Sequence, residues 1–270
     1  MTTPSTLCAA VAQMVSSASQ AENLRRAESL LAEARAAGAE LVLLPENFSF
    51  MGLQDTDKLA LMEEPGRGPV QDWLAAQAAR LGIWLLGGSI PLRATDGRCH
   101  ASLLVYDDTG RLRARYDKMH LFDVQLAEGE SYRESGTIAP GDTPCQVESP
   151  WGGVGLSICY DLRFPELYRQ YAGASLLVVP SAFTVPTGRA HWEILLRARA
   201  IENQAFVLAA DQGGNHANGR STWGHSMIID PWGQILAQLE TGEGIAIATL
   251  DMSQLVQTRE RLPALQHRRL

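Results

Sequence analysis

The hydrophobic pattern of the first third of the chain predicts strands and helices in alternation. Residues 7–14 are mostly apolar and predict a strand. Residues 21–37 place leucine and alanine at helical spacing and are followed by Gly38, which is typical of a helix end. The unbroken apolar run at 41–44 is typical of a parallel strand that is covered on both faces. A second helix at 69–80 and a strand at 83–86 repeat this order.

The rest of the chain keeps this alternation around one irregular segment. Residues 101–106 and 112–116 flank Asp107-Asp108-Thr109-Gly110, which predicts a hairpin. Residues 117–141 lack periodicity, and loops of that length inside a compact domain are usually functional or disordered. Strands are then expected at 154–158, 176–179, 206–210, 227–229 and 245–250, with helices at 165–171 and 191–203. The pattern predicts one α/β domain over residues 1–270.

Composition and charge narrow the class of partner. With 46% hydrophobic residues the chain can bury a large core, and no apolar run approaches the ~20 residues of a membrane span. A net charge of −7 argues against a nucleic-acid partner, which calls for a basic face. The N-terminus carries no secretion signal, and the four cysteines lack metal-ligand spacing. We therefore expect a cytoplasmic protein with reduced thiols, no metal and no membrane contact.

Cys159 is the first candidate for chemistry. It follows the strand expected at 154–158 and precedes a helix that Pro165 opens, so it lies at the carboxyl edge of the sheet. If backbone N–H groups of the turn point toward it, a thiolate is favoured there. A small buried core residue is the alternative, because unpaired cysteines are among the most buried side chains.

Two charged residues also follow expected strands, and a third lies in the irregular segment. Glu46 directly follows the strand at 41–44, where either a general base or a solvated helix-start acid fits. Lys118 follows the strand at 112–116, and Glu134 lies within the irregular segment. Taken singly, Lys118 and Glu134 fit ordinary surface charges. The recurrence of an acid, a cation and a thiol at separate strand ends favours a shared site.

Three segments carry a family resemblance: Leu44-Pro45-Glu46, residues 117–122 (DKMHLF) and residues 158–166 (ICYDLRFPE). Together they resemble the nitrilase superfamily of carbon–nitrogen hydrolases, over essentially the whole chain. The resemblance implies a four-layer αββα sandwich. It also implies a Glu-Lys-Cys triad carried here by Glu46, Lys118 and Cys159, with Glu134 as an accessory glutamate.

The implied chemistry suits these residue types. Glu46 takes the thiol proton, Cys159 attacks an amide carbon, and Lys118 with the backbone N–H after Cys159 stabilises the oxyanion. Glu46 then protonates the departing amine, and an activated water hydrolyses the thioester. Glu134 orients Lys118 or the water. No cofactor is required.

The segment after Cys159 resembles the Nit branch of the superfamily. This branch implies an amidase for a small ω-amide of an α-keto acid, with deaminated glutathione, cleaved to α-ketoglutarate and Cys-Gly, as the expected substrate. Such a substrate is an anion, and Arg163 is the expected carboxylate partner, with a helix-start pair to Glu166 as the alternative. The remaining expected pocket residues are Tyr160, Phe183, Thr184 and Thr187. The glycine-rich loop at 213–219 fits either a mobile lip of the site or a plain connection.

The sequence leaves other functions open. An ω-amidase acting on α-ketoglutaramate is the nearest alternative. A catalytically silent member that binds a partner, and an acyltransferase that passes the thioester to an amine, are the others. The resemblance also implies a homodimer or larger homo-oligomer, formed by the helices expected at 165–171 and 191–203 with the C-terminal tail reaching across.

Overall fold

A seven-stranded sheet forms the first half of the fold. The structure is a computed structural model that describes residues 4–125, 131–171 and 173–269. The strand order is β15-β1-β2-β3-β5-β4, with β6 also paired to β5, and β1, β2 and β3 are parallel. The bounds are β1 (Thr6–Gln13), β2 (Leu41–Leu43), β3 (Trp84–Leu86), β4 (Ile90–Arg93), β5 (Cys99–Tyr106), β6 (Leu112–Asp117) and β15 (Gly244–Asp251).

A six-stranded sheet forms the second half. Its order is β14-β13-β12-β11-β10-β9, and three of its inner strands, β10, β11 and β12, are parallel. The bounds are β9 (Gln146–Ser149), β10 (Gly152–Leu156), β11 (Leu176–Ser181), β12 (Phe206–Asp211), β13 (Met227–Ile229) and β14 (Ile235–Gln238). A short hairpin of β7 (Asp123–Gln125) and β8 (Ser131–Arg133) stands apart from both sheets.

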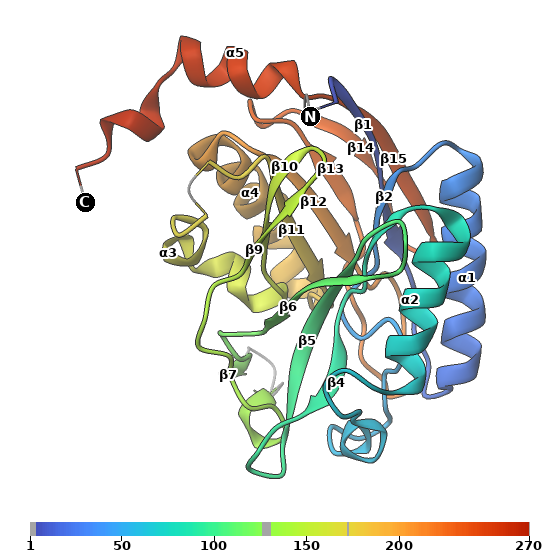
Figure 1. Ribbon diagram of the computed structural model, residues 1–270. Coiled ribbons are helices and arrows are strands. Elements are labelled where there is room, and N and C mark those ends of the chain that lie inside the picture. Colours follow the sequence, from blue (N-terminus) through green and yellow to red (C-terminus); the bar gives the residue numbers. More distant parts are fainter. Residues whose placement is uncertain (1–3, 126–130, 172, 270) are drawn as a thin grey trace.

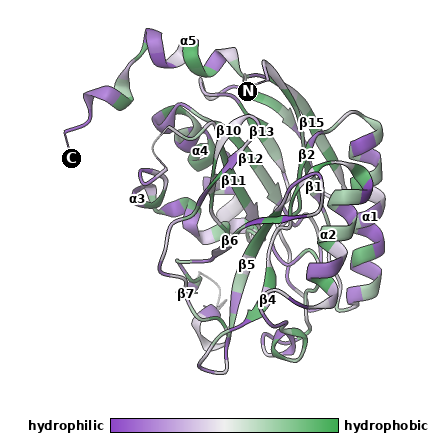
Figure 2. Ribbon diagram, in the orientation of Figure 1, coloured by the Kyte–Doolittle hydropathy of each residue, from purple (hydrophilic) through white to green (hydrophobic). Residues whose placement is uncertain are grey.

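Alternation of side chains along the strands explains how the layers stack. In β1, Leu7 and Val11 join the core that both sheets share, whereas Ala10 and Ala12 belong to the core beneath the helices. Those helices are α1 (Gln20–Ala36) and α2 (Pro69–Leu81), and Figure 1 shows them side by side over the first sheet. Figure 2 shows hydrophobic strands between helices with hydrophilic outer surfaces.

The outer face of the second sheet is covered by α4 (Val185–Asn203), which buries Trp192, Leu196 and Ala200 completely. The short α3 (Pro165–Tyr168) lies beside it (Figure 1). Helices therefore cover both sheets from outside, and the expected four-layer αββα sandwich is confirmed.

The predicted elements differ from the structure mainly at ends and in short strands. The helix expected at 191–203 begins six residues earlier, at Val185, because Thr184 is extended and Pro186 fits the first helical turn. The helix expected at 165–171 ends as an α-helix at Tyr168. Pattern reading missed β4, β7, β8, β9, β14 and the helix α5 (Ser253–Arg261). All but α5 are strands of three or four residues, too short to display a period.

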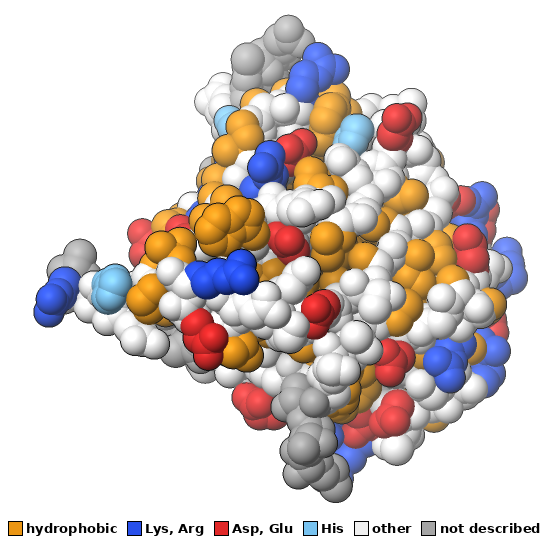
Figure 3. Space-filling model, turned by 90° about the horizontal axis from the view of Figure 1, so that it is seen from above, with side chains coloured by type: hydrophobic (Ala, Val, Ile, Leu, Met, Phe, Trp, Pro, Cys, Tyr) orange, Lys and Arg blue, Asp and Glu red, His pale blue; other side chains and the backbone are white. Residues whose placement is uncertain are grey.

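The C-terminal segment leaves the body of the protein. Helix α5 and the 3-10 turn Ala264–His267 form an arm that projects from the sandwich, visible at the left of Figures 1 and 3. Arg259 anchors the base of the arm through hydrogen bonds to the carbonyls of Ala174 (2.6 Å) and Gln204 (2.9 Å). Within the described residues, no helix has the length and apolarity needed to cross a membrane.

Candidate active site

Four chain segments that follow strands converge on one small pocket. Glu46 follows β2, Lys118 follows β6, Cys159 follows β10 and Ala182 follows β11. Together with Glu134 they line a cavity of about 60 Å³. Glu46 comes from the first sheet and Cys159 from the second, so the site exists only because the two sheets pack face to face. The four residues expected to carry the chemistry are thus brought together.

The nucleophile candidate sits on a strained turn. Cys159 has φ +51°, in the left-handed region that a residue with a side chain rarely adopts, and it opens a short 3-10 helix, Cys159–Arg163. Such a conformation costs about 1–3 kcal/mol and persists where the surroundings impose it. Asp161, which is fully buried, accepts a hydrogen bond from the backbone N–H of Ile158 at 2.9 Å and so closes the turn.

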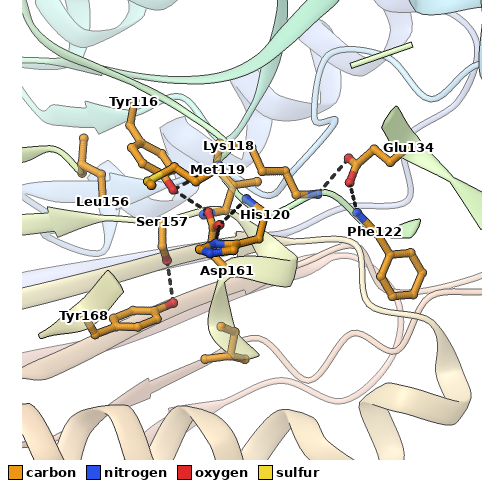
Figure 4. A network of polar contacts seen from close by, with 12 residues as sticks. Tyr116, Lys118, Met119, His120, Phe122, Glu134, Leu156, Ser157, Asp161 and Tyr168 are labelled. Atoms are coloured by element: carbon orange, nitrogen blue, oxygen red, sulfur yellow. Dashed lines mark hydrogen bonds and ion pairs between the residues drawn. The ribbon is translucent and has the colours of Figure 1, made fainter. Parts of the chain in front are cut away.

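Asp161 also ties this turn to the segment that follows Lys118. Its carboxylate accepts hydrogen bonds from the Tyr116 hydroxyl (2.7 Å) and the backbone N–H of His120 (3.0 Å), and contacts the His120 Nδ1 (2.7 Å). Figure 4 shows these groups gathered around Asp161. One buried carboxylate therefore sets the position of the Cys159 turn relative to the lysine.

Lys118 is held between two carboxylates. Its Nζ donates to Glu46 Oε1 and to Glu134 Oε1, both at 2.8 Å, and its side chain is 1% exposed. The other oxygen of Glu134 accepts from the backbone N–H of Phe122 at 2.6 Å (Figure 4). An ammonium has three N–H donors, so one remains for a group in the pocket.

These contacts determine the protonation states of Glu46 and Lys118. Burial alone would raise the pKa of Glu46, but the charge and hydrogen bond of Lys118, with the charge of Arg220 and a hydrogen bond from Cys159, hold that pKa below its ordinary value. Burial would likewise lower the pKa of Lys118, and the carboxylates of Glu134 and Glu46 instead raise it well above its ordinary value. Glu46 is therefore a carboxylate and Lys118 an ammonium at neutral pH.

Cys159 rests as a thiol. Burial and the negative charge of Glu46 raise its pKa well above the ordinary value, and the charge of Lys118 and the backbone N–H of Ala182 offset only part of this. The backbone N–H group that reaches the sulfur therefore does not by itself make a thiolate the resting form. The two negative charges would face each other in a buried site, so the thiolate must form by transfer of its proton to Glu46.

All five residues expected to contact substrate line the pocket: Tyr160, Arg163, Phe183, Thr184 and Thr187. The guanidinium of Arg163 lies over the rings of Tyr160 (5.7 Å) and Phe183 (5.5 Å) and contacts His191 Nδ1 at 3.2 Å. In the described part of the chain it forms no ion pair with Glu166, and its polar side-chain contact is with His191.

Sequence reading missed several residues of the site. Asn47, with φ +58°, and Arg220 both line the pocket, and Gln212 donates to the Glu46 carbonyl (2.9 Å). Asn47 is a polar residue directly after Glu46, and this position could have identified it from the sequence. Arg220 directly follows the loop at 213–219, and the Nδ1 of His216 in that loop contacts the Ser16 carbonyl at 2.9 Å. The glycine-rich loop fitted a lip of the site, but nothing local in the sequence indicates that Arg220 reaches the pocket.

Comparison with known proteins agrees with this geometry. The family model described as carbon-nitrogen hydrolase matches residues 8–260. A deaminated glutathione amidase of Synechocystis sp. is 44% identical over 266 residues, covering 96% of this chain and 97% of the relative. The omega-amidase NIT2 of Mus musculus is 38% identical over 267 residues, covering 98% of this chain and 96% of the relative.

Solved structures give the same picture. The C. elegans NitFhit protein has a TM-score of 0.91 at 37% identity, covering 99% of this chain and 66% of that longer chain. Saccharomyces cerevisiae Nit3, a member of branch 10 of the nitrilase superfamily, has a TM-score of 0.89 at 30% identity, covering 98% of this chain and 97% of its own. The chain belongs to the carbon–nitrogen hydrolase family. Within the nitrilase superfamily, its sequence resembles the deaminated glutathione amidases.

Proposed function

We propose that the chain hydrolyses amides through a thioester on Cys159. The observation that carries this proposal is the buried Glu46–Lys118–Glu134 network beside a strained, protonated cysteine. Glu46 accepts the thiol proton as the sulfur attacks the amide carbon. The carbonyl oxygen becomes an oxyanion, which the free N–H of Lys118 and the backbone N–H of Tyr160 stabilise.

The second half of the reaction uses the same carboxylate. Protonated Glu46 transfers its proton to the leaving nitrogen, the carbon–nitrogen bond breaks, and an acyl thioester remains on Cys159. Glu46 then takes a proton from water as the water oxygen attacks the thioester. The carbon–sulfur bond breaks, the carboxylic acid leaves, and Glu46 returns the proton to the Cys159 sulfur. Glu134 holds Lys118 in place during both steps, because its other oxygen is fixed by the Phe122 backbone.

Deaminated glutathione is the proposed substrate, with α-ketoglutarate and Cys-Gly as products. The resemblance to deaminated glutathione amidases supports it. The pocket also suits an anion: five basic side chains and three carboxylates line it, although the whole chain carries a net charge of −7. Arg163, held against two rings, is the proposed partner of the α-keto acid carboxylate.

The decisive measurement is kcat/KM for deaminated glutathione and α-ketoglutaramate with the same enzyme. We expect the dipeptide amide to be preferred. The second candidate is an ω-amidase acting on α-ketoglutaramate, which the 38% identity to mouse omega-amidase NIT2 favours, and a higher kcat/KM for α-ketoglutaramate would select it. Hydroxylamine added to the assay traps the thioester as a hydroxamate. Absence of both hydrolysis and hydroxamate would favour a silent, partner-binding protein, whereas transfer faster than hydrolysis would favour an acyltransferase.

We further propose a homodimer. Three large apolar side chains on or beside α4 are exposed: Ile194 (70%), Ile201 (48%) and Trp232 (66%). Ile194 and Ile201 are two helical turns apart and share one face, and the turn at Gly233 packs against Ile201. Obligate interfaces bury such faces, and light scattering at micromolar concentration should give twice the chain mass.

A cytoplasmic location is proposed on the chemistry of the cysteines. All four are free thiols, and a protein that keeps unpaired thiols fits a reducing compartment. Fractionation followed by immunodetection would test this.

A further inference from the structure

A second, larger space lies directly outside the inner pocket. We call it the vestibule: an open cavity of about 770 Å³, against about 60 Å³ for the inner pocket. The two spaces are continuous, because six residues line both: Asn47, Asp55, Lys58, Tyr132, Thr184 and Arg220. Release of ammonia from a primary amide would not need a space of this size.

The vestibule lies on the side where the leaving group must depart. In the proposed reaction Glu46 gives its proton to the leaving nitrogen, so that nitrogen faces Glu46 when the bond breaks. Asn47 is the next residue in the chain and lines the vestibule. The positive charge of Arg220 acts on Glu46, and Arg220 lines the vestibule as well. An amine larger than ammonia would therefore extend from Glu46 into the vestibule.

The vestibule offers cations that lack an anionic partner. The Nη2 of Arg220 donates a hydrogen bond to the Ala182 carbonyl, and the guanidinium lies over the Tyr132 ring at 5.5 Å. Its buried Nε has no hydrogen-bond partner among the residues that the structure describes. Neither Arg220 nor Lys58 has a carboxylate within ion-pair distance in the described chain. Asp55, which is exposed, is the acidic side chain of the vestibule lining, so the cations are in excess by one.

The guanidinium of Arg220 is incompletely hydrogen-bonded and has no carboxylate partner within the described residues. A buried N–H without an acceptor loses its bonds to water and gains nothing in return. An anionic group of the substrate that occupies the vestibule would pair with the positive charges of Arg220 and Lys58, which both line it. Arg163 lines the inner pocket and is absent from the vestibule lining, so it serves the other half of the substrate.

We propose that the vestibule is the binding subsite for an amine leaving group that carries a carboxylate, with Arg220 and Lys58 as its cationic partners. This rests on the proposed amide hydrolysis and assigns its two carboxylates to separate ends of the site. The acyl half presents its carboxylate to Arg163, and the leaving dipeptide presents its terminal carboxylate to the vestibule. The subsite selects amides of carboxylate-bearing amines over primary amides.

Three substrates that form the same thioester isolate the subsite. They are deaminated glutathione, the same compound with a terminal carboxamide in place of the glycine carboxylate, and α-ketoglutaramate. Lys58→Gln should lower kcat/KM for the first about tenfold to a hundredfold, because a charge-assisted contact is lost. The two compounds without that carboxylate should change less than twofold. Lys58→Arg should retain most of the activity.

Arg220 requires a second readout because it also contacts the Ala182 carbonyl beside Cys159. Arg220→Gln should lower kcat/KM for all three substrates, with the largest loss for the substrate that carries the terminal carboxylate. The dipeptide Cys-Gly should inhibit the wild-type enzyme and lose that inhibition in Lys58→Gln. Arg25→Gln is the matched control, because Arg25 is an exposed cation on α1, away from the site.

The outcomes separate this proposal from the proposed function. If the wild-type enzyme cleaves deaminated glutathione and Lys58→Gln affects all three substrates equally, the subsite is overturned while the amidase function stands. If the wild-type enzyme cleaves none of the three, the proposed function itself fails. A wild-type enzyme that shows no preference between the acid and its carboxamide would also overturn the subsite.

Discussion

The inner pocket and the vestibule differ in whether their charged side chains are paired. In the inner pocket Lys118 bridges two carboxylates at 2.8 Å each and is almost completely buried. In the vestibule, Arg220 and Lys58 lack carboxylate partners in the described chain, and the space around them is open. Paired buried charges fix protonation states and geometry before substrate arrives, whereas unpaired ones obtain their partner from the ligand. The charges that carry out the reaction are therefore separate from the charges proposed to select the leaving group.

The largest effect should come from removing the thiol of the inner pocket. Cys159→Ala should reduce turnover by roughly 10⁴-fold or more, because nucleophile and base act as one unit. Steady-state assays and mass spectrometry of a trapped acyl adduct measure this. Cys8→Ala, Cys99→Ala and Cys145→Ala are the controls and should keep activity. An adduct on one of those three cysteines would show that the nucleophile is misassigned.

Lys118→Met should be next, with a loss of about 10²–10³-fold in kcat, as when an oxyanion donor is removed. The same change leaves Glu46 and Glu134 buried without a cation, so unfolding free energy should fall by about 3–5 kcal/mol. Chemical denaturation and kcat on α-ketoglutaramate are the measurements. If Lys118→Met changed KM alone, Lys118 would be a binding residue, and the inner pocket would not differ from the vestibule in this respect.

Asp161→Asn tests whether the turn that carries Cys159 is positioned from outside the pocket. Loss of an accepting oxygen disturbs the bonds from Ile158 and His120, and a displacement of about 1 Å can cost about a hundredfold in rate. We expect a loss of about tenfold to a hundredfold in kcat with little change in KM. Asp107→Asn, which accepts from its own hairpin turn, is the matched control. If Asp161→Asn lost as much stability as Asp107→Asn but kept its kcat, Asp161 would have only a structural role.

The smallest effect should be that of pH across the neutral range. The pKa of Glu46 lies below its ordinary value of 4.5 and that of Cys159 well above 9.0, so neither group titrates between pH 6 and 8. kcat/KM for a neutral amide should be flat there and fall only at more acid pH, as Glu46 becomes protonated. The stabilising contribution of ionised Glu46 is present above its unfolded pKa and is lost as pH falls through the folded one. A tenfold rise in kcat/KM per pH unit from 6 to 8 would instead show a titrating thiol.

The sequence determined the order of strands and helices and the reacting residues of the inner pocket, whereas the four-layer sandwich was implied by the family resemblance. Alternating apolar runs and amphipathic helices are local patterns, and they place strands and helices because burial of one face is their common driving force. Glu46, Lys118 and Cys159 could be predicted from the sequence because each comes just after a strand with a strong hydrophobic pattern. Glu134 was reached through the family resemblance, because the segment around it has no period of its own.

The tertiary structure alone decided the state and the surroundings of those residues. The resting form of Cys159 follows from burial beside Glu46, a residue 113 positions earlier on the other sheet. Arg220 reaches the pocket only because its loop is fastened to Ser16 and the Ala182 carbonyl. Electrostatics and hydrogen bonds act through space, and their strength depends on separation and burial that a linear pattern does not contain. The sequence therefore specified which groups react, and the packing of two sheets decided their charges, their strain and the space that admits a substrate.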